Sequence, residues 1–167
     1  HATKDAELRA AFLRTCEEHG LNAECVTINQ KLRRADGEYG YPAIQIRQKA
    51  FVEWLYDLGF RPSHEERTIP VIFYRQPAWI RDALLRGLFS ADGHRRHHTT
   101  GYNTPSVMSM STVFQPEIIK CLWSVGVAAN LIGSGWHREG VIVAQDVGAF
   151  VERIGFLQAY KNEDLQR

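Results

Sequence analysis

The chain has 167 residues, of which 44% are hydrophobic and 23% are charged, with a formal net charge of +1. These values are typical of a folded globular protein, long enough for one domain or two small packed halves, and they argue against disorder. No apolar run approaches the roughly 18 residues of a transmembrane helix, and no signal peptide is present, so we expect an intracellular, cytoplasmic protein. Three scattered cysteines without a CxxC pair indicate reduced thiols and argue against structural zinc.

The first part of the chain alternates between helical and extended patterns. Apolar side chains recur at helical spacing over residues 5–18, a pattern that ends at His19-Gly20. Residues 24–34 and 41–47 then alternate as two strands joined by a turn. A second helix is predicted over residues 48–58, ending at Gly59.

Alternation along the two strands predicts which side chains face outward. In the first strand, Val26 and Ile28 lie on one side, and Cys25 begins the opposite, more polar side. In the second strand, Ile44 and Ile46 face inward. The expected outward set is Cys25, Thr27, Asn29, Lys31, Arg33, Gln45 and Arg47.

A third helix is predicted over about residues 77–92. Ile80, Leu84 and Leu88 recur every four residues on one face. Beside them runs a stripe of small side chains that permits close contact with another helix. The stripe consists of Ala83, Gly87 and Ala91.

The two ends of this helix carry different signals. Gln76-Pro77 suits a helix start, and Gly93 suits the left-handed position that ends one. Asp92 therefore lies at the negative end of the helix dipole, where a surface carboxylate is disfavoured by about 0.3 to 1 kcal/mol. We expect a cation to compensate it.

The later part of the chain repeats the order of the first. A helix over 116–125, strands near 127–134 and 140–145, and a helix over 146–154 are predicted. Their glycine-ended helices match in letters as well as in order, because Leu58-Gly59-Phe60 corresponds to Ile154-Gly155-Phe156. The pattern predicts an internal duplication.

Other segments between these elements are polar or aromatic. In an extended segment, Val107, Ser109 and Ser111 oppose Met108 and Met110, whereas the basic run 94–98 is polar on both faces and has no predicted direction. Trp54, Trp79 and Trp123 are expected in the core, and Trp136 in a hairpin loop.

The segment Leu-Leu-Arg-Gly-Leu-Phe-Ser-Ala-Asp-Gly, residues 84–93, resembles the second signature motif of the LAGLIDADG homing endonucleases, DNA-cutting enzymes found inside inteins and introns. Thr68-Ile69-Pro70 before it, and Ile154-Gly155-Phe156-Leu157 and Lys161 after it, stand at family-like spacing and favour the intein branch. The resemblance covers nearly the whole chain. It implies an α+β fold, a pseudo-twofold pair of αββαββα units with saddle-shaped antiparallel sheets.

The resemblance divides the chain into an incomplete first half, 1–75, and a complete second half, 76–167. Asp92 precedes Gly126 by 34 residues, and the same spacing counted back from Gly20 falls before residue 1. The first signature helix and its acidic residue are therefore expected outside this chain, whether cleaved, unresolved or supplied by another chain. A protein with both halves intact is expected to be a monomer.

The resemblance also implies catalytic roles. Asp92 matches the aspartate that binds Mg²⁺, and Lys161 matches a basic residue near the attacking water. Arg67 stands where the family pattern has lysine, and arginine does not readily act as a base. The alternative interpretations are an ordinary helix-end Asp-Gly turn for Asp92, and surface cations for Lys161 and Arg67.

Double-stranded DNA is the implied partner, with the strands entering the major groove. A hairpin tip near Trp136 could clamp the DNA backbone or be an ordinary tip. The predicted DNA-binding residues are Asn29, Lys31, Arg33, Gln45, Arg47, Arg95, Arg96, Ser109, Ser111, His137 and Arg138.

The leading hypothesis is a site-specific double-strand DNA endonuclease, the endonuclease part of an intein, that uses Mg²⁺-dependent phosphodiester hydrolysis. The chain shows neither a nucleophilic Cys or Ser at its start nor the His-Asn of an intein terminus at its end, so any splicing domain is expected outside it. The alternatives are a non-catalytic LAGLIDADG nucleic-acid binder, such as a decayed endonuclease, a transcription regulator or an intron maturase, and an unrelated α+β interaction module.

Overall fold

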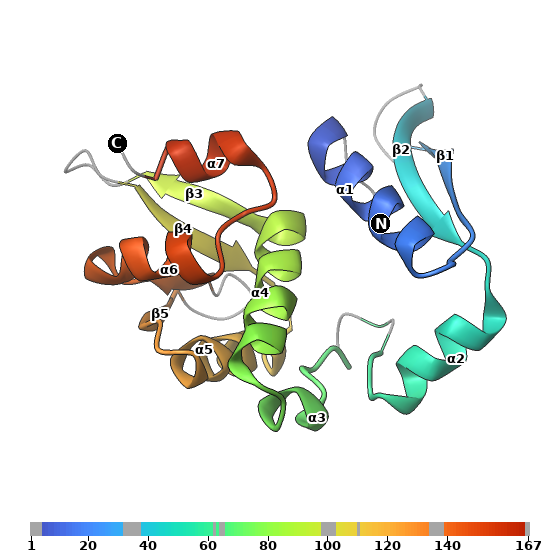
Figure 1. Ribbon diagram of the computed structural model, residues 1–167. Helices are drawn as coiled ribbons and strands as arrows, with labels where there is room; N and C mark the ends of the chain where they lie inside the picture. The colour runs from blue at the N-terminus through green and yellow to red at the C-terminus, as the bar shows by residue number, and fades with distance from the viewer. Residues whose placement is uncertain are drawn as a thin grey trace. The chain divides into compact units, whose positions relative to one another are not determined.

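The computed structural model describes residues 5–31, 38–61, 63, 66–97, 103–109, 111–133 and 139–165, without the side chains of 27–31 and 38–42. The chain packs as two compact units, His1–Val52 and Glu53–Arg167, and each is described by itself (Figure 1). In the part of the chain so described, no helix has the length and apolar character needed to cross a membrane.

The elements follow the order predicted from the sequence, with additions in the second unit. The predicted helices over 5–18, 48–58, 77–92, 116–125 and 146–154 are confirmed, each within about two residues of its expected ends. A short 3₁₀ turn at Ala144–Asp146 precedes the last of them. The first unit contains α1 (Ala6–Glu18), β1 (Ala23–Lys31) and β2 (Glu38–Ile46). Helix α2 (Lys49–Asp57) crosses the division between the two units. The second unit contains α3 (Val71–Tyr74), α4 (Ala78–Asp92), β3 (Gly93–His97), β4 (Asn103–Met108), α5 (Phe114–Ser124), β5 (Ala129–Ile132), β6 (Glu139–Ile142), α6 (Val147–Arg153) and α7 (Ala159–Glu163).

Helix α1 is defined by capping at both ends. The Asp5 side chain accepts a hydrogen bond from the Leu8 N–H at 3.0 Å, which satisfies one of the unpaired donors of the first turn. At the other end Gly20 has φ +64°, and the N–H groups of Gly20 and Leu21 donate to the carbonyls of Glu17 and Cys16. This is the paired hydrogen bonding of a Schellman motif.

Helix α5 ends with the same motif. Gly126 has φ +77°, and the N–H groups of Gly126 and Val127 donate to Trp123 and Leu122. The sequence match between the glycines after the two helices therefore extends to their backbone geometry. It supports the predicted duplication of local structure, whereas the pseudo-twofold pairing and the halves 1–75 and 76–167 remain a proposal.

Strands β1 and β2 pair antiparallel, and their register corrects one prediction. Glu24 pairs with Gln45, and Cys25 pairs with Ile44. Directly paired residues project to the same side of a sheet, so Cys25 shares a side with Ile44 and not with Gln45. The prediction that Cys25 and Gln45 share an outward surface is wrong, because each strand had been oriented separately without the register that links them.

The second unit contains a four-stranded antiparallel sheet in the order β3-β4-β6-β5. Helix α4 packs against β3 and β4, and α5 packs against β5 and β6 (Figure 1). Val107 and Ile142, at most 1% exposed, project into the core beneath these helices. The side chains that alternate with them form what we call the outer face. Its members are His94, Arg96, Thr104, Ser106, Met108, Asn130, Ile132, Glu139 and Val141.

The core of the second unit centres on three phenylalanine rings. Phe89 of α4 and Phe150 of α6 meet edge to face at 4.9 Å between ring centroids, and Phe156 lies 5.6 Å from Phe150 in the same geometry. Burying each ring removes a large apolar area from water, so the contacts fix α4 against the C-terminal helices. The antiparallel sheets and packed helices together confirm the expected α+β class.

Three tryptophans predicted to lie in the core are exposed instead. Trp54, Trp79 and Trp123 have 53%, 69% and 59% of their surface accessible. Trp123 keeps its indole N–H paired by donating to the Ala129 carbonyl at 3.0 Å. The large apolar surface of tryptophan favours burial, and that was the basis of the prediction. In the structure the core is instead filled by other side chains of α4 and α5, such as Phe89.

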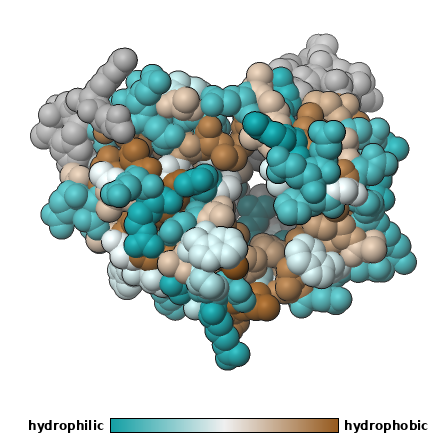
Figure 2. Space-filling view, viewed as in Figure 1, coloured by the Kyte–Doolittle hydropathy of each residue, from teal (hydrophilic) through white to brown (hydrophobic). Residues whose placement is uncertain are grey.

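Some of the exposed apolar side chains of the second unit lie on α3 and at the start of α4. Val71 and Ile72 of α3 are 69% and 45% exposed, beside the exposed Trp79. Figure 2 shows apolar atoms over α3, at the lower edge of the view. This end of α4 lies far along the helix from Asp92, which ends it.

Candidate functional site

The C-terminal end of α4 gathers the three residues expected to be catalytic. Asp92 is the last residue of the helix, and its side chain is 47% exposed. Arg67 NH1 lies 3.7 Å from Asp92 Oδ2. The cation expected from the unfavourable position of Asp92 at the helix terminus is therefore present.

Gly93 shapes this end of the helix in a way that the sequence did not predict. Its φ of −83° and ψ of 153° are extended, so the prediction of a left-handed helix end is wrong. The helix passes directly into β3, and a Cβ at Gly93 would lie 2.4 Å from the Phe89 carbonyl oxygen. Glycine is needed here for close backbone approach, not for a positive φ.

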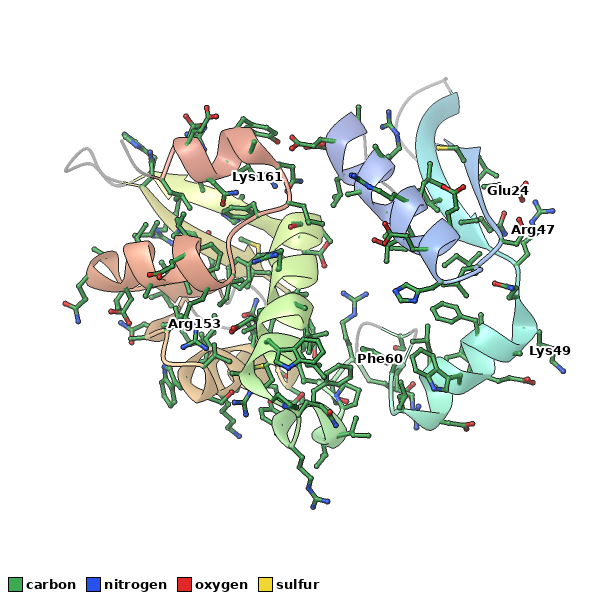
Figure 3. The ribbon with its side chains drawn as sticks, in the orientation of Figure 1. Glu24, Arg47, Lys49, Phe60, Arg153 and Lys161 are labelled. Atoms are coloured by element: carbon green, nitrogen blue, oxygen red, sulfur yellow. The ribbon has the colours of Figure 1, made fainter. Side chains whose placement is uncertain are left out.

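Lys161 reaches the same end of α4 from α7, as labelled in Figure 3. Its Nζ donates to the Gly93 carbonyl at 3.1 Å and lies 5.0 Å from the centre of the Phe156 ring. The ammonium group therefore lies over an aromatic face and next to the helix terminus, and a cation is favoured at both.

Buried hydrogen bonds hold the segment that carries Lys161. The Leu157 N–H donates to Ser90 Oγ at 2.8 Å, and Gln158 Nε2 donates to the Ser90 carbonyl at 3.0 Å. Asn162 accepts from the Phe156 N–H and donates to its carbonyl, both at 2.8 Å. Because Ser90 and Gln158 are 1% exposed, these contacts fix α7 to α4 with little freedom.

Arg67 is positioned by a separate set of contacts to α5. Its guanidinium lies 5.8 Å from the centre of the Phe114 ring. Two residues further on, the Ile69 N–H donates to Glu117 Oε2 at 2.6 Å, and the Tyr74 hydroxyl donates to the Glu117 carbonyl at 3.1 Å. Burial and the Glu117 charge raise the pKa of Tyr74 above its ordinary range, so the hydroxyl stays protonated as a donor.

The described residues do not by themselves make a metal centre. They contain no group of three or more His, Cys, Asp or Glu side chains placed to hold an ion. Asp92 offers one carboxylate, and Arg67 stands beside it. Hard divalent cations require several oxygen ligands, so a second carboxylate or substrate oxygens are needed to complete a site here.

The stripe of small residues on α4 is exposed within the second unit. Ala83, Gly87 and Ala91 are open to solvent, and a Cβ added at Gly87 would have no neighbour within 4 Å. Next to the stripe lies an apolar groove of about 440 Å³, bordered by Leu84 and Leu88 of the helix. The surface has the close-approach geometry that was expected for packing with another helix.

The predicted DNA-binding residues are placed at several different surfaces. Gln45 and Arg47 are exposed, and Arg47 Nε lies 2.7 Å from Glu24 Oε1 (Figure 3). Arg96 is on the outer face of the second sheet, whereas Arg95 pairs with Asp164 at 2.8 Å. Arg33, His137 and Arg138 lie outside the described residues, as do the side chains of Asn29 and Lys31.

Ser109 and Ser111 do not extend strand β4. Strand β4 ends at Met108, and Val107, predicted to share their side, lies in the core. Ser111 is 4% exposed, and its Oγ accepts from the Phe114 N–H at 3.1 Å. The outward placement predicted for Ser111 is wrong, because its side chain is buried and its hydroxyl is bound by the Phe114 N–H at the start of α5.

Glu139 was not predicted as a site residue from the sequence, and the direction of the His94 side chain was not predicted either. Both lie on the outer face, where His94 Nε2 is 2.9 Å from Glu139 Oε1. Only the pairing of β6 with β4 and of β4 with β3 brings them together, and that pairing joins residues more than forty positions apart. The basic run alone carried no signal for its direction.

Comparisons with known proteins agree with this architecture. The chain is 27% identical over 176 residues to a DNA polymerase of Thermococcus litoralis, covering 97% of this chain and 10% of the polymerase. It is 31% identical over 109 residues to a DNA polymerase of Thermococcus hydrothermalis, covering 59% of this chain and 6% of the polymerase. The chain thus spans a tenth or less of the length of these relatives, and no family model matches it.

Two solved structures share the fold. One is I-DmoI in complex with DNA and Mn, with a TM-score of 0.58 and 12% identity over 92% of this chain and 78% of that one. The other is the N-terminal LAGLIDADG domain of DUF199/WhiA, with a TM-score of 0.60 and 14% identity over 98% of this chain and 73% of that one. The chain is homologous to a segment of archaeal DNA polymerases and has the LAGLIDADG homing endonuclease fold.

Proposed function

We propose that this chain belongs to a site-specific double-strand DNA endonuclease whose active centre forms at the C-terminal end of α4. Asp92 binds the catalytic metal ion, Lys161 lies beside the reacting phosphate, and Arg67 neutralises charge on the opposite side. The chain would be the endonuclease part of an intein within a DNA polymerase, and it would act inside the cell on genomic DNA.

The observation that carries the proposal is the convergence of Asp92, Arg67 and Lys161. The three residues come from separate segments, yet one ion pair and one hydrogen bond join them to the last turn of α4 and the residue after it. Phosphodiester cleavage develops negative charge on the phosphate oxygens, and two cations next to a metal-binding carboxylate suit that chemistry. The shared fold with a protein crystallised with DNA and Mn gives separate support.

Mg²⁺ or another hard divalent cation is the proposed cofactor. Such an ion activates water and stabilises the developing charge on the phosphate. Asp92 would supply one oxygen ligand. Since the described residues offer no complete site, the proposal requires a second carboxylate from a further signature helix.

The exposed stripe on α4 gives this second helix a place to pack. Ala83, Gly87 and Ala91 would allow the backbones of the two helices to approach closely, and the apolar groove would accept its larger side chains. This pairing would create the pseudo-twofold arrangement of the halves 1–75 and 76–167. The intact two-half protein would act as a monomer, with any splicing domain outside this chain.

Cleavage of the uninterrupted host sequence tests the proposal. The full-length protein is incubated with Mg²⁺ and a plasmid that carries the polymerase gene without its insertion. We expect conversion of the plasmid to one linear product, and we expect Asp92→Asn to lower the rate at least about a hundredfold, because several kcal/mol of metal stabilisation is lost. Asp57→Asn, which changes an exposed aspartate that also ends a helix, α2, is the matched control.

If the protein binds the plasmid sequence but does not cleave it with any of the divalent ions tested, the enzyme proposal is wrong. It would favour a second candidate function, a non-catalytic LAGLIDADG nucleic-acid binder. The Arg67–Asp92 pair is the observation that favours this candidate, because a cation held at the carboxylate competes with a metal ion for the same oxygens.

A further inference from the structure

The outer face of the second sheet contains a carboxylate that is almost completely buried. The Glu139 side chain is 9% exposed, although it projects away from the core helices α4 and α5. An ionised carboxylate is costly to bury unless cations and hydrogen bonds compensate it. Arg96 supplies a cation and a hydrogen bond to one oxygen of Glu139, Oε2.

Two side chains of β3 lie next to the two oxygens of Glu139, and the arginine donates a hydrogen bond to one of them. Arg96 NH1 lies 2.5 Å from Oε2, and His94 Nε2 lies 2.9 Å from Oε1. His94 Nε2 is also 3.1 Å from the Ser106 hydroxyl, whose residue is fully buried. Glu139 therefore spans from β6 across β4 to β3 and ties the two outer side chains to fixed positions.

Arg96 remains partly exposed in this arrangement. Its side chain is 40% accessible, and the ion pair to Glu139 engages NH1. A guanidinium carries five N–H donors in a rigid fork, so the N–H groups on its other nitrogens can donate hydrogen bonds to a further acceptor. A hollow of about 380 Å³ on the same face borders Arg96, Thr104 and Asn130.

The charge of this cluster suits reading a base better than holding a phosphate. A carboxylate next to Arg96 cancels much of the attraction of the guanidinium for the phosphate backbone, because that attraction depends on net positive charge. It does not prevent a hydrogen bond from a well-oriented arginine. Arginine donating to O6 and N7 of guanine is the commonest specific contact in the major groove.

We propose that Arg96 is a specificity-determining residue that reads a guanine in the major groove, and that Glu139 is the positioning residue that orients it. The inference rests on the proposed function only in requiring that the protein bind duplex DNA. It adds the base class that this part of the outer face recognises. It also assigns a role to a buried acidic side chain on a DNA-facing surface.

The first unit offers a matched comparison. Arg47 and Glu24 form a similar pair at 2.7 Å, but their side chains are 65% and 47% exposed. Such exposed pairs contribute little and hold neither side chain firmly. Glu24→Gln is therefore the control for Glu139→Gln. Both substitutions remove a negative charge next to an arginine, but only Glu139→Gln removes a buried charge.

The experiment selects binding sites from a random-sequence duplex library with the full-length protein and with each variant. We expect the wild-type protein to select a site with guanine at one position, preferred roughly 10- to 100-fold over other bases. In Arg96→Ala and Arg96→Lys this preference falls below about 3-fold, while the other positions are unchanged. Glu139→Gln reduces the preference at the same position, and Glu24→Gln does not.

Arg96→Lys keeps a cation beside Glu139, so it remains informative if Glu139→Gln fails to fold. If Arg96→Lys leaves every base preference unchanged, the inference is overturned and the endonuclease proposal stands. If Arg96→Lys loses the guanine while a folded Glu139→Gln keeps it, the positioning role of Glu139 is overturned. If the wild-type protein selects no sequence at all, the proposed function fails and the inference fails with it.

Discussion

Arg67 NH1 lies 3.7 Å from Asp92 Oδ2, so the carboxylate that ends α4 has a cationic partner within its own unit. The side chains are 31% and 47% exposed, which places the pair at the surface. Exposed pairs typically contribute between 0 and about 1 kcal/mol. We therefore expect Arg67 to contribute to DNA binding and to contribute little to the free energy of unfolding.

Replacing Arg67 tests this expectation. Arg67→Ala should lower the free energy of unfolding by less than about 1 kcal/mol, but it should weaken DNA binding and reduce the slope of log affinity against log salt by about 1, because one phosphate contact is lost. Arg67→Lys retains the charge and should retain the slope. Binding titrations at several salt concentrations measure it, and an unchanged slope in Arg67→Ala would contradict a phosphate contact.

Lys161 gives a prediction about the reaction rate. Lys161→Met keeps a flexible apolar side chain but removes the charge that lies over the Phe156 ring and next to the Gly93 carbonyl. The cleavage rate should fall about 100-fold, because one group that stabilises the developing charge is gone, while DNA affinity changes little. Single-turnover cleavage of a plasmid target measures the rate.

Lys120→Met is the control for this change, because Lys120 is an exposed lysine of α5. It should leave the cleavage rate within about twofold of the wild-type value, as expected for a surface substitution remote from the chemistry. Equal rate losses in both lysine variants would indicate a general effect of charge and would remove Lys161 from the proposed site.

Two glycines of the signature segment give opposite predictions for stability. Gly93→Ala should destabilise the protein by about 1 to 3 kcal/mol, because its Cβ would overlap the Phe89 carbonyl oxygen. In the chain of 167 residues, where the stripe is open, Gly87→Ala should raise the free energy of unfolding by about 0.5 to 1 kcal/mol, because alanine favours the helix and no atom lies within 4 Å of the new Cβ. Urea unfolding of the two variants measures both changes.

The Gly87→Ala variant also separates stability from assembly. The added methyl group lies on the stripe proposed to pack against a second helix, where close approach of the backbones requires small side chains. Cleavage by the full-length protein should therefore decrease although this unit becomes more stable. An unchanged cleavage rate would indicate that the stripe faces solvent in the active protein.

Periodicity was sufficient to predict α4. Pro77 at the start of the helix and Asp92 at its end stand where the sequence placed them, because strong local signals define both ends. The grouping of Arg67 and Lys161 at Asp92 was expected from the family resemblance alone. Neither residue has a local signal, since both approach α4 from distant parts of the chain.

What the sequence could not supply is the register between strands. The pairing of Cys25 with Ile44, and the crossing of Glu139 to Arg96, depend on which strands become neighbours, and a shift of one residue reverses every side chain. The same limit explains the misplaced Ser111, since periodicity along an extended segment does not show where the strand ends and the next helix begins.

Burial of the Cys121 thiol is expected to lower the free energy of unfolding as the pH becomes alkaline. The thiol is fully buried in the core, and desolvation raises its pKa from 9.0 to about 11. In the unfolded chain the thiol ionises near its ordinary pKa, so between about pH 9 and pH 11 the unfolded state loses the proton first and becomes relatively more stable. The contribution of Cys121 is complete below pH 9 and is lost as pH rises toward 11. A shift of two pKa units corresponds to about 2 to 3 kcal/mol over that window.

Comparing the wild-type protein with Cys121→Ala isolates this effect from other alkaline groups such as Tyr74, whose pKa is also raised. The variant should be less stable at pH 8, because a cavity replaces the buried sulfur. Its stability should then decline less steeply than that of the wild-type protein from pH 9 to pH 11, so the difference between the two narrows. Urea unfolding at several pH values measures this convergence. Parallel curves would show that the Cys121 thiol ionises equally easily in the folded and unfolded chains, which is incompatible with its burial.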